Sequence, residues 1–289
     1  MLQFYKKFFS SGDKLRDLEA YIISRFNSSY IGDDAALIGN ICYSVDTFFE
    51  DVHFKRLWMN MAQIGRKAML VNLSDAIAMN AKPLYALVAL SLPKDIKTSE
   101  IEELSNALTN CAKEFGCEII GGDTISADKL TISITIISKT DNPLLRKGLK
   151  EGDMLAYTGE LGTSKRDLQR LFAGETIEPK SKFYEPVLRQ EFIKRSREYL
   201  RVGMDISDGL FCDTNKLLDT NNIGLELFGD IDASIGNSGE EYEMLIGFDP
   251  ANLPQLEQIA KQTNTPLAAF GVMKKNSFRF LCNPHHFKS

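Results

Sequence analysis

NLSDAIAMNAKP, residues 72–83, and MDISDGL, residues 204–210, carry the strongest structural signal in this chain. In each stretch an apolar run leads to a serine–aspartate pair, with Asp75 in the first and Asp208 in the second. An element that emerges from a core carries such a carboxylate to the edge of the fold, where several elements can converge. The two stretches therefore predict one site that collects carboxylates from distant parts of the chain.

Further aspartates follow apolar residues in the same way. They are Asp33 and Asp34 in IGDDAA, Asp46 in YSVD, Asp123 in IGGDT and Asp205 in MDISDG. Converging carboxylates repel one another unless cations are present, and Mg²⁺ prefers oxygen ligands that it shares with substrate phosphates. Each pair alone is also ordinary turn or N-cap chemistry, so the number of sites favours magnesium and phosphate over a purely structural reading.

Helical and strand-like periodicities are mixed along the whole chain, which predicts an α+β fold. Among the expected elements are a helix over 185–200 and a strand over Phe278–Cys282. The stretch 139–152 has the Pro, Gly, Asp and Asn content of a domain-crossing loop. We place a boundary near residue 145, which gives an N-terminal domain over 1–145 and a C-terminal α/β domain over 146–289.

The bulk composition excludes several classes of protein. The 289 residues carry a formal net charge of -5, so we expect no nucleic-acid partner. No segment approaches about 18 uncharged apolar residues, so we expect no membrane partner. The 5 cysteines lack zinc-site spacing, and three lie in apolar runs typical of buried free thiols. We expect a soluble, unprocessed, cytoplasmic protein.

Other phosphate and nucleophile chemistries do not fit. GELGTSK, residues 159–165, misplaces the second glycine of a P-loop, and the protein-kinase loops are absent. The 3 histidines, His53, His285 and His286, have no neighbouring serine or cysteine that suggests a nucleophile and its base. A lone histidine is more often structural, although the position of His53 just after the Asp46 strand makes contact with an anionic substrate plausible.

An ordered set of motifs identifies a family. It consists of IGDDAA, SVD followed by FEDVHF, NLSDAIAMNAKP, GGDT, RKGLKEGD, TGELG, MDISDGL and SGEEYEM, between about residues 31 and 247. The chain resembles bacterial thiamine-monophosphate kinases. The resemblance implies the two-domain fold of aminoimidazole-ribonucleotide synthetase, a homodimer formed by pairing N-terminal mixed sheets, and an ATP cleft made partly across that dimer. It also implies phosphoryl transfer from ATP to thiamine monophosphate without a phosphoenzyme.

The resemblance implies roles for individual residues. The implied Mg²⁺ ligands are Asp33, Asp34, Ser44, Val45, Asp46, Asp75, Asp123, Asp205 and Asp208, with either Asp33 or Asp34 as the ligand in their pair. The implied ATP contacts are Phe115, Gly122, Asp123, Arg146 and Ser207. The implied substrate contacts are His53, Glu240 and Phe287. Asp75, Asp123, Asp208 and Arg146 are the implied catalytic residues.

Three departures from the family pattern affect the substrate side. Glu241 is one methylene longer than the usual aspartate, which is expected to shift the substrate pocket. Asp51 stands where glycine is usual, so a β or helical backbone is expected in place of a permissive turn. The second half is also shorter than is typical, particularly after residue 247.

Two alternatives stay open at this point. One is an ATP-using enzyme like aminoimidazole-ribonucleotide synthetase, and the other is a silent nucleotide-binding scaffold. Selenophosphate synthetase and the hydrogenase-maturation relative are disfavoured. The first needs a reactive cysteine near the N-terminus, yet Cys42 is the first in the chain, and the second needs a C-terminal cysteine, yet the chain ends HHFKS.

Overall fold

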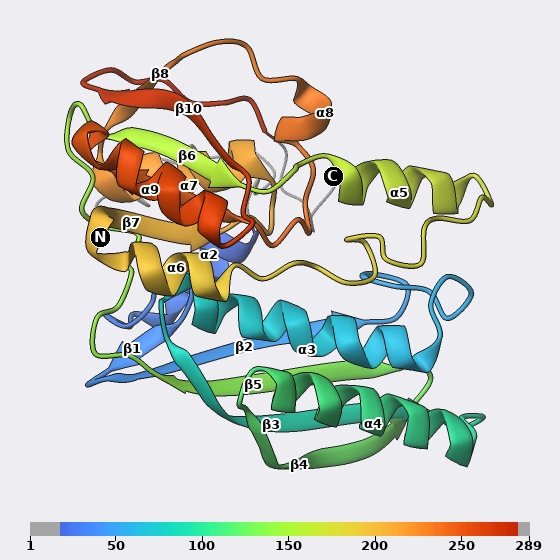
Figure 1. The fold of residues 1–289 in the computed structure, drawn as a ribbon. Helices are drawn as coiled ribbons and strands as arrows, with labels where there is room; N and C mark the ends of the chain where they lie inside the picture. The colour runs from blue at the N-terminus through green and yellow to red at the C-terminus, as the bar shows by residue number, and fades with distance from the viewer. Residues whose placement is uncertain (1–17, 283–289) are drawn as a thin grey trace.

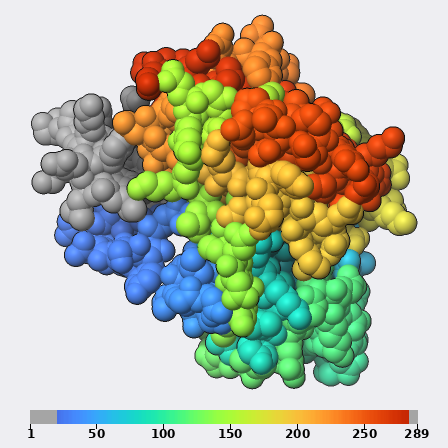
Figure 2. All heavy atoms as spheres, turned by 60° about the vertical axis from the view of Figure 1, so that its left-hand side comes forward, coloured from blue at the N-terminus to red at the C-terminus, as the bar shows by residue number. Residues whose placement is uncertain are grey.

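Two five-stranded sheets with their helices make up the protein, seen here in a computed structural model that describes residues 18–282 (Figure 1). The first sheet belongs to the N-terminal half of the chain and the second to the C-terminal half. Figure 2 shows the yellow-green segment that comes after the first sheet running from one half up to the other. The predicted substrate contact Phe287 and the histidines His285 and His286 lie outside the described residues.

The N-terminal sheet has the strand order β1-β2-β5-β3-β4. Its strands are β1 (Ala36–Ile38), β2 (Ile41–Phe49), β3 (Lys82–Pro93), β4 (Glu118–Ala127) and β5 (Thr131–Lys139). Neighbours pair antiparallel except β3 and β4, which are parallel. The crossover that this parallel pair requires contains helix α4 (Thr98–Glu114).

Helices α3 (Met61–Ala78) and α4 cover one face of this sheet (Figure 1). Residues of α3 are buried all round because the helix lies between its own sheet and the C-terminal half. Strand β5, TISITIISK, alternates in burial, and Ile132, Ile134 and Ile136 are fully buried against the helices. A capping box between Asn60 and Gln63 starts α3 by satisfying its first amide groups.

The opposite face of the same sheet exposes large apolar side chains. They are Tyr43 and Val45 on β2, Tyr85 and Leu87 on β3, and Ile125 on β4, each at least 40% exposed. Alternation along each strand places these residues on one side and the buried residues on the other. The N-terminal sheet therefore has one face packed under helices and one apolar face bare in a single chain.

The C-terminal sheet is antiparallel throughout, with the order β7-β9-β6-β10-β8. Its strands are β6 (Met154–Thr158), β7 (Leu200–Asp205), β8 (Gly224–Leu227), β9 (Met244–Phe248) and β10 (Leu267–Lys274). One core lies between this sheet and α7 (Leu210–Asn221). A second core joins the sheet to α6 (Gln190–Ser196) and α9 (Leu253–Gln262).

The remaining elements are short. They are α2 (Leu18–Phe26), α5 (Thr163–Phe172), α8 (Ala233–Gly236) and two 3₁₀ turns, Arg197–Tyr199 and Pro250–Asn252. The proposed boundary near residue 145 lies between the last strand of the first sheet and the first strand of the second. Among residues 18–282, no helix combines the length and the apolar character that a bilayer crossing requires.

Three expectations about local structure were wrong. Phe278–Cys282 forms no strand, because the last strand of the chain is β10, which ends at Lys274. The helix expected over 185–200 is limited to Gln190–Ser196, because the chain turns through a 3₁₀ segment into β7 at Leu200. Cys212 and Cys282 form a disulfide that spacing alone did not indicate, whereas Cys42, Cys111 and Cys117 are buried free thiols.

Candidate active site

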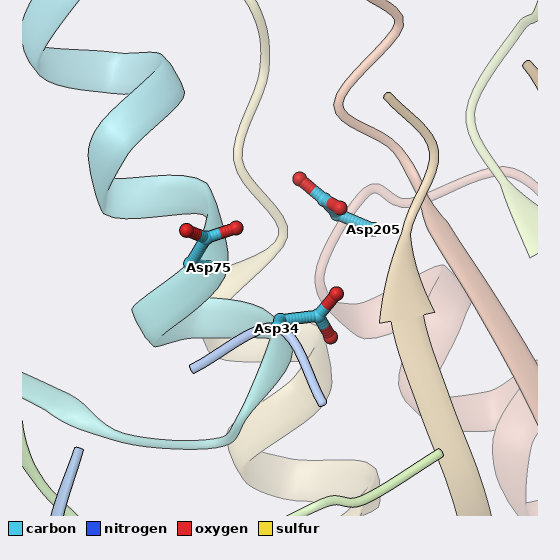
Figure 3. A group of neighbouring side chains, drawn as sticks. All are labelled: Asp34, Asp75 and Asp205. Atoms are coloured by element: carbon cyan, nitrogen blue, oxygen red, sulfur yellow. The ribbon is translucent and has the colours of Figure 1, made fainter. Parts of the chain in front are cut away.

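Three carboxylates meet between the two sheets. One oxygen from each of Asp34, Asp75 and Asp205 lies within 4.8 Å of the other two (Figure 3). Asp34 lies in the segment before β1, Asp75 in the last turn of α3, and Asp205 at the C-terminal end of β7. The cluster therefore combines residues from both halves of the chain, and it contains three of the seven aspartates that the sequence analysis singles out.

This cluster is short of positive charge. Burial raises the pKa of Asp75 well above its usual range, and the charges of Asp46 and Asp205 raise it further. Burial, followed by the charge of Asp34, raises the pKa of Asp205 to about 8, although the Ser74 hydroxyl opposes this by donating to it at 2.6 Å. A group of carboxylates whose charged forms are all disfavoured is electrostatically suited to a cation.

The donor set fits Mg²⁺. One carboxylate oxygen of Asp34, Oδ2, is buried without a hydrogen-bond partner among the described residues. Such a group costs free energy unless a ligand or ion satisfies it. A hard divalent cation takes oxygen ligands of this kind, and each ion is usually held by one or two carboxylates together with substrate phosphates.

Asp33 and Asp34 point to different partners. The Asp33 carboxylate accepts a hydrogen bond from the backbone N–H of Arg146 at 2.7 Å, while Asp34 lies in the carboxylate cluster and forms an ion pair with the Arg146 guanidinium. The guanidinium Nε of Arg146 is buried without a partner among the described residues. Arg146 thus keeps a donor beside the carboxylates, and a planar fork of this kind suits a phosphate.

Strand β2 is fixed to α3 beside the cluster. The backbone N–H of Asp46 donates to the Asn72 side chain at 2.9 Å, and the Asn72 amide donates in turn to the Ala68 carbonyl at 2.8 Å. This bridge positions Asp46 and the predicted ligands before it, Ser44 and Val45. The sequence reasoning did not single out Asn72 or Ser74, although both belong to the NLSD motif.

Asp208 begins the turn into α7 and forms an ion pair with a lysine. Lys216 contacts the Asp208 carboxylate at 2.5 Å and Asp213 at 2.9 Å. The Asp208 N–H donates to Asp213 at 3.0 Å, which fixes the turn. Gly209 comes next with a φ of 103°, a conformation that favours glycine. The neighbouring Ser207 accepts a hydrogen bond at its carbonyl from the Glu240 N–H at 2.8 Å.

The structure does not bring Gly122 and Asp123 to this cluster within one chain. One row of paired residues crosses four strands and consists of Asp46, Ile134, Val88 and Gly122. Because the row spans three strand spacings, Asp46 lies roughly 14 Å from β4. Asp123 faces the bare apolar side of the sheet, and Ala89, Ser91, Ile125, Thr131 and Ser133 line the shallow hollow beside it.

Gly122 and Phe115 have clear structural roles. A Cβ on Gly122 would lie 1.7 Å from the Val88 carbonyl oxygen, so no larger residue fits at its φ of +156°. Phe115 ends α4 and packs against the N-terminal core. Neither residue contacts the carboxylate cluster in a single chain, and their predicted roles toward ATP stay predictions.

Two of the predicted substrate contacts, His53 and Glu240, lie near α3. The ring nitrogen Nδ1 of His53 accepts a hydrogen bond from the Phe49 N–H at 2.9 Å, and the ring stacks on Phe48. The Glu240 carboxylate contacts the ammonium of Lys67 at 2.6 Å. Lys67 was not singled out from the sequence, because a lysine within a helical stripe is usually a solvated residue.

The two unusual residues on the substrate side take unexpected positions. Glu241 is fully buried and accepts from the N–H groups of Gly162 and Ser164 at 2.8 and 3.2 Å, so its longer side chain caps the start of α5. The expectation for Asp51 was wrong. Its φ is +67°, so it keeps the left-handed turn that a glycine would adopt, with Lys129 contacting its carboxylate at 2.5 Å.

Comparison with known proteins supplies related sequences. Residues 32–140 match the family model described as AIR synthase related protein, N-terminal domain. The chain is 32% identical to thiamine-monophosphate kinase of Aquifex aeolicus, over 70% of this chain and 69% of the relative. It is 34% identical to the Bacillus subtilis protein of the same name, over 68% and 66%, and 32% identical to that of Leptospira interrogans, over 74% and 76%.

Solved structures with the same fold cover almost the whole chain. AaThiL complexed with AMPPCP and TMP superposes with a TM-score of 0.80 at 25% identity, covering 94% of this chain and 96% of that one. Thiamine monophosphate kinase from Aquifex aeolicus gives 0.79 at 26% identity, covering 92% and 97%. The HypE-HypF complex gives 0.76 at 18% identity, covering 90% and 93%, and therefore shares the fold alone.

Proposed function

Because the chain belongs to the thiamine-monophosphate kinase family, we propose that it transfers the terminal phosphoryl group of ATP to thiamine monophosphate, forming thiamine diphosphate and ADP. The observation that carries this proposal is the cluster of Asp34, Asp75 and Asp205 between the two halves. A phosphoryl-transfer site needs positioning and charge neutralisation more than it needs a protein nucleophile.

We propose that this cluster holds Mg²⁺. Asp34, Asp75 and Asp205 would be the central ligands, and the unsatisfied Asp34 oxygen supports this assignment. The other proposed ligands are Ser44, Val45, Asp46, Asp123 and Asp208, while Asp33 instead holds the backbone N–H of Arg146. When bound, Mg²⁺ would offset the negative charge of the donor and acceptor phosphates.

The chain's own groups would orient the phosphates. Arg146 is anchored at three points, since Asp33 binds its N–H, Asn221 binds its carbonyl at 2.8 Å, and Asp34 binds its guanidinium. Its buried Nε could donate to a phosphate oxygen without the side chain having to reorganise. The acceptor is itself a phosphate oxygen that is largely ionised near neutral pH, so a strong general base is unnecessary.

We further propose that the active form is a homodimer. The bare apolar face of the N-terminal sheet supports this, because a large exposed apolar patch commonly marks a protein interface. Gly122 and Asp123 lie on strand β4, far from the carboxylate cluster of their own chain. Pairing of two such faces would let the β4 strand of one copy complete the nucleotide site of the other.

Two further features of the proposal rest on the nature of the substrates and on the charge of the chain. ATP and a phosphorylated vitamin precursor are intracellular metabolites, which supports action in the cytoplasm. The net charge of -5 supports the absence of a nucleic-acid partner.

The function can be tested with purified protein, Mg²⁺, ATP and three acceptors: thiamine monophosphate, unphosphorylated thiamine and an aminoimidazole precursor. We expect equal amounts of thiamine diphosphate and ADP with thiamine monophosphate only. Turnover of the aminoimidazole precursor would favour the synthetase-like alternative. Binding of ATP without transfer to any acceptor would favour the silent scaffold and would refute the proposal.

A further inference from the structure

A fully buried lysine lies beside the candidate site. The side chain of Lys67, in the second turn of α3, is 0% exposed. Lysine is almost never fully buried unless its charge is paired. The same helix carries Asp75 eight residues further on, about 12 Å along the axis. Lys67 thus occupies a rigid element that also positions the carboxylate cluster.

The ammonium of Lys67 has a defined set of neighbours. Its Nζ lies 2.6 Å from Oε2 of Glu240, 4.4 Å from the centre of the Phe183 ring and 5.6 Å from that of Phe48. The aromatic faces attract the cation but cannot neutralise it. The Glu240 carboxylate supplies that neutralising charge, so the ammonium and the carboxylate depend on each other.

Glu240 differs from Lys67 in its access to solvent. Its side chain is 15% exposed, whereas Lys67 is enclosed. Glu240 can therefore meet a small molecule, and Lys67 can act on that molecule only through Glu240. The two residues are 173 positions apart in sequence, so the contact joins the N-terminal half to the C-terminal half.

The backbone around Glu240 is also constrained. Glu240 has a left-handed φ of +55°, its N–H donates to the Ser207 carbonyl at 2.8 Å, and its carbonyl accepts from the Ser164 hydroxyl at 3.0 Å. Ser207 precedes Asp208 at the start of α7. A shift of the Glu240 side chain would therefore occur against a fixed backbone, and the contact with Lys67 sets where its carboxylate points.

We propose that Lys67 is a positioning residue for recognition of the acceptor. It fixes the Glu240 carboxylate in one orientation, in which that carboxylate can accept a hydrogen bond from, or lie against, the amino-bearing or cationic part of the acceptor. This inference rests on the proposed function and on the contact with the acceptor that the family resemblance implies for Glu240. It adds a residue that touches no substrate itself but determines the affinity for one of the two substrates.

The competing explanation is that Lys67 only stabilises the fold through a buried ion pair. Lys182 provides a matched control for that explanation. It contacts Glu241 at 3.3 Å and Glu243 at 2.9 Å in the same loop, and it is 16% exposed. Those two carboxylates are fully buried and face the start of α5 and Arg189, not the carboxylate cluster. Substitution of Lys182 removes a similar buried ion pair and leaves the contacts of Glu240 unchanged.

The test compares Lys67→Met with Lys182→Met in the full chain, using steady-state kinetics with each substrate varied. We expect K67M to raise the KM for thiamine monophosphate by about 10- to 100-fold, the range known for residues that orient metal-binding side chains. The kcat and the KM for ATP should change by less than about threefold. K182M should leave the KM for thiamine monophosphate within about threefold, whatever it does to the melting temperature.

A double variant tests whether Lys67 acts through Glu240. If it does, K67M combined with Glu240→Gln should have nearly the same KM for thiamine monophosphate as E240Q alone. The inference is overturned if K67M leaves that KM unchanged, if K182M raises it equally, or if the K67M and E240Q effects multiply.

A spectroscopic measurement decides the matter if K67M does not fold. The NMR signal of the Lys67 ammonium is assigned as the lysine signal that is missing in Lys67→Arg. In the unaltered protein, thiamine monophosphate should shift this signal, and ATP alone should leave it in place. A signal that thiamine monophosphate does not shift overturns the inference. The proposed function is tested separately by the unaltered protein. If it does not phosphorylate thiamine monophosphate, the function fails; if it does and K67M behaves normally, only the role of Lys67 fails.

Discussion

The pH dependence of stability without Mg²⁺ is set directly by the buried carboxylates. The folded protein holds a proton on Asp205 up to a pKa of about 8, because of burial and the Asp34 charge, whereas the ordinary value is 3.8. Between these values the folded state binds more protons than the unfolded state. The free energy of unfolding therefore falls as the pH rises through this window, and the contribution is fully present only below about pH 4.

The size of this pH effect follows from the raised pKa of Asp205. Each pH unit changes the free energy of unfolding by about 1.4 kcal/mol for one proton. From about pH 5.5 to about pH 8, the titration of Asp205 alone lowers the free energy of unfolding by on the order of 3 kcal/mol. Asp75 acts in the same direction, since burial and the charges of Asp46 and Asp205 raise its pKa as well.

Urea unfolding at several pH values, in a chelator and in Mg²⁺, measures this effect. In the chelator, stability should decline steadily toward pH 8. In Mg²⁺ the decline should flatten, because the ion favours the charged carboxylates and its stabilisation grows with pH. Asp205→Asn should flatten the metal-free profile by removing the titrating group. A metal-free stability that rises with pH, or an unchanged slope in D205N, would refute this reading of the cluster.

Other variants test separate parts of the site. D75N and D208N should each lower kcat by roughly a hundredfold or more while circular dichroism and the oligomeric state stay normal, because each removes a charge from the transition state's surroundings; full activity in both would exclude the metal assignment. Mixing inactive D75N with inactive D123N under subunit exchange should restore about a quarter of the activity if sites are shared across a dimer, and no recovery would mean that each chain builds its site alone. Glu241→Ala should lower the free energy of unfolding by about 1 to 3 kcal/mol, because it removes the cap of α5. The KM for thiamine monophosphate should stay unchanged, and a raised KM would show that Glu241 takes part in binding the substrate.

Convergence of aspartates could be predicted from the sequence because it depends on a local rule. Asp75 and Asp205 each lie at the end of a buried element, and the ends of such elements meet where the two halves of the fold pack. The choice between Asp33 and Asp34 could not be made in this way. It depends on which carboxylate faces Arg146's backbone and which faces the cluster, and that is set by a contact more than 100 residues away in the chain.

The distance between Asp123 and the carboxylate cluster also could not be predicted from the sequence. GGDT has the same local pattern as the other motifs, yet strand order places it at the far edge of the sheet and on the opposite face from Asp46. A motif indicates which residues end a strand but not which strands are neighbours in the sheet. The resemblance to the kinase family implies a dimer, and in our proposal that dimer brings Asp123 of one chain to the carboxylate cluster of the other.

Errors in local structure came from competing uses of the same residues. The apolar and aromatic residues of Phe278–Cys282 suggested a strand, but Phe280 stacks on Phe211 and its backbone is bonded to the Asn215 side chain. Asp51 was expected to need an ordinary backbone. Aspartate tolerates the left-handed region better than most residues, and the ion pair with Lys129 helps to hold it there.

Transfer of a labelled phosphoryl group distinguishes direct phosphorylation of thiamine monophosphate from transfer through the protein and from hydrolysis of ATP. The protein would be mixed with ATP labelled at the terminal phosphate, Mg²⁺ and thiamine monophosphate for a single turnover, and the label would be traced in protein, free phosphate and thiamine compounds. We expect the label to move from ATP to thiamine diphosphate without appearing on the protein. Label on the protein, or release as free phosphate with no thiamine diphosphate formed, would contradict it.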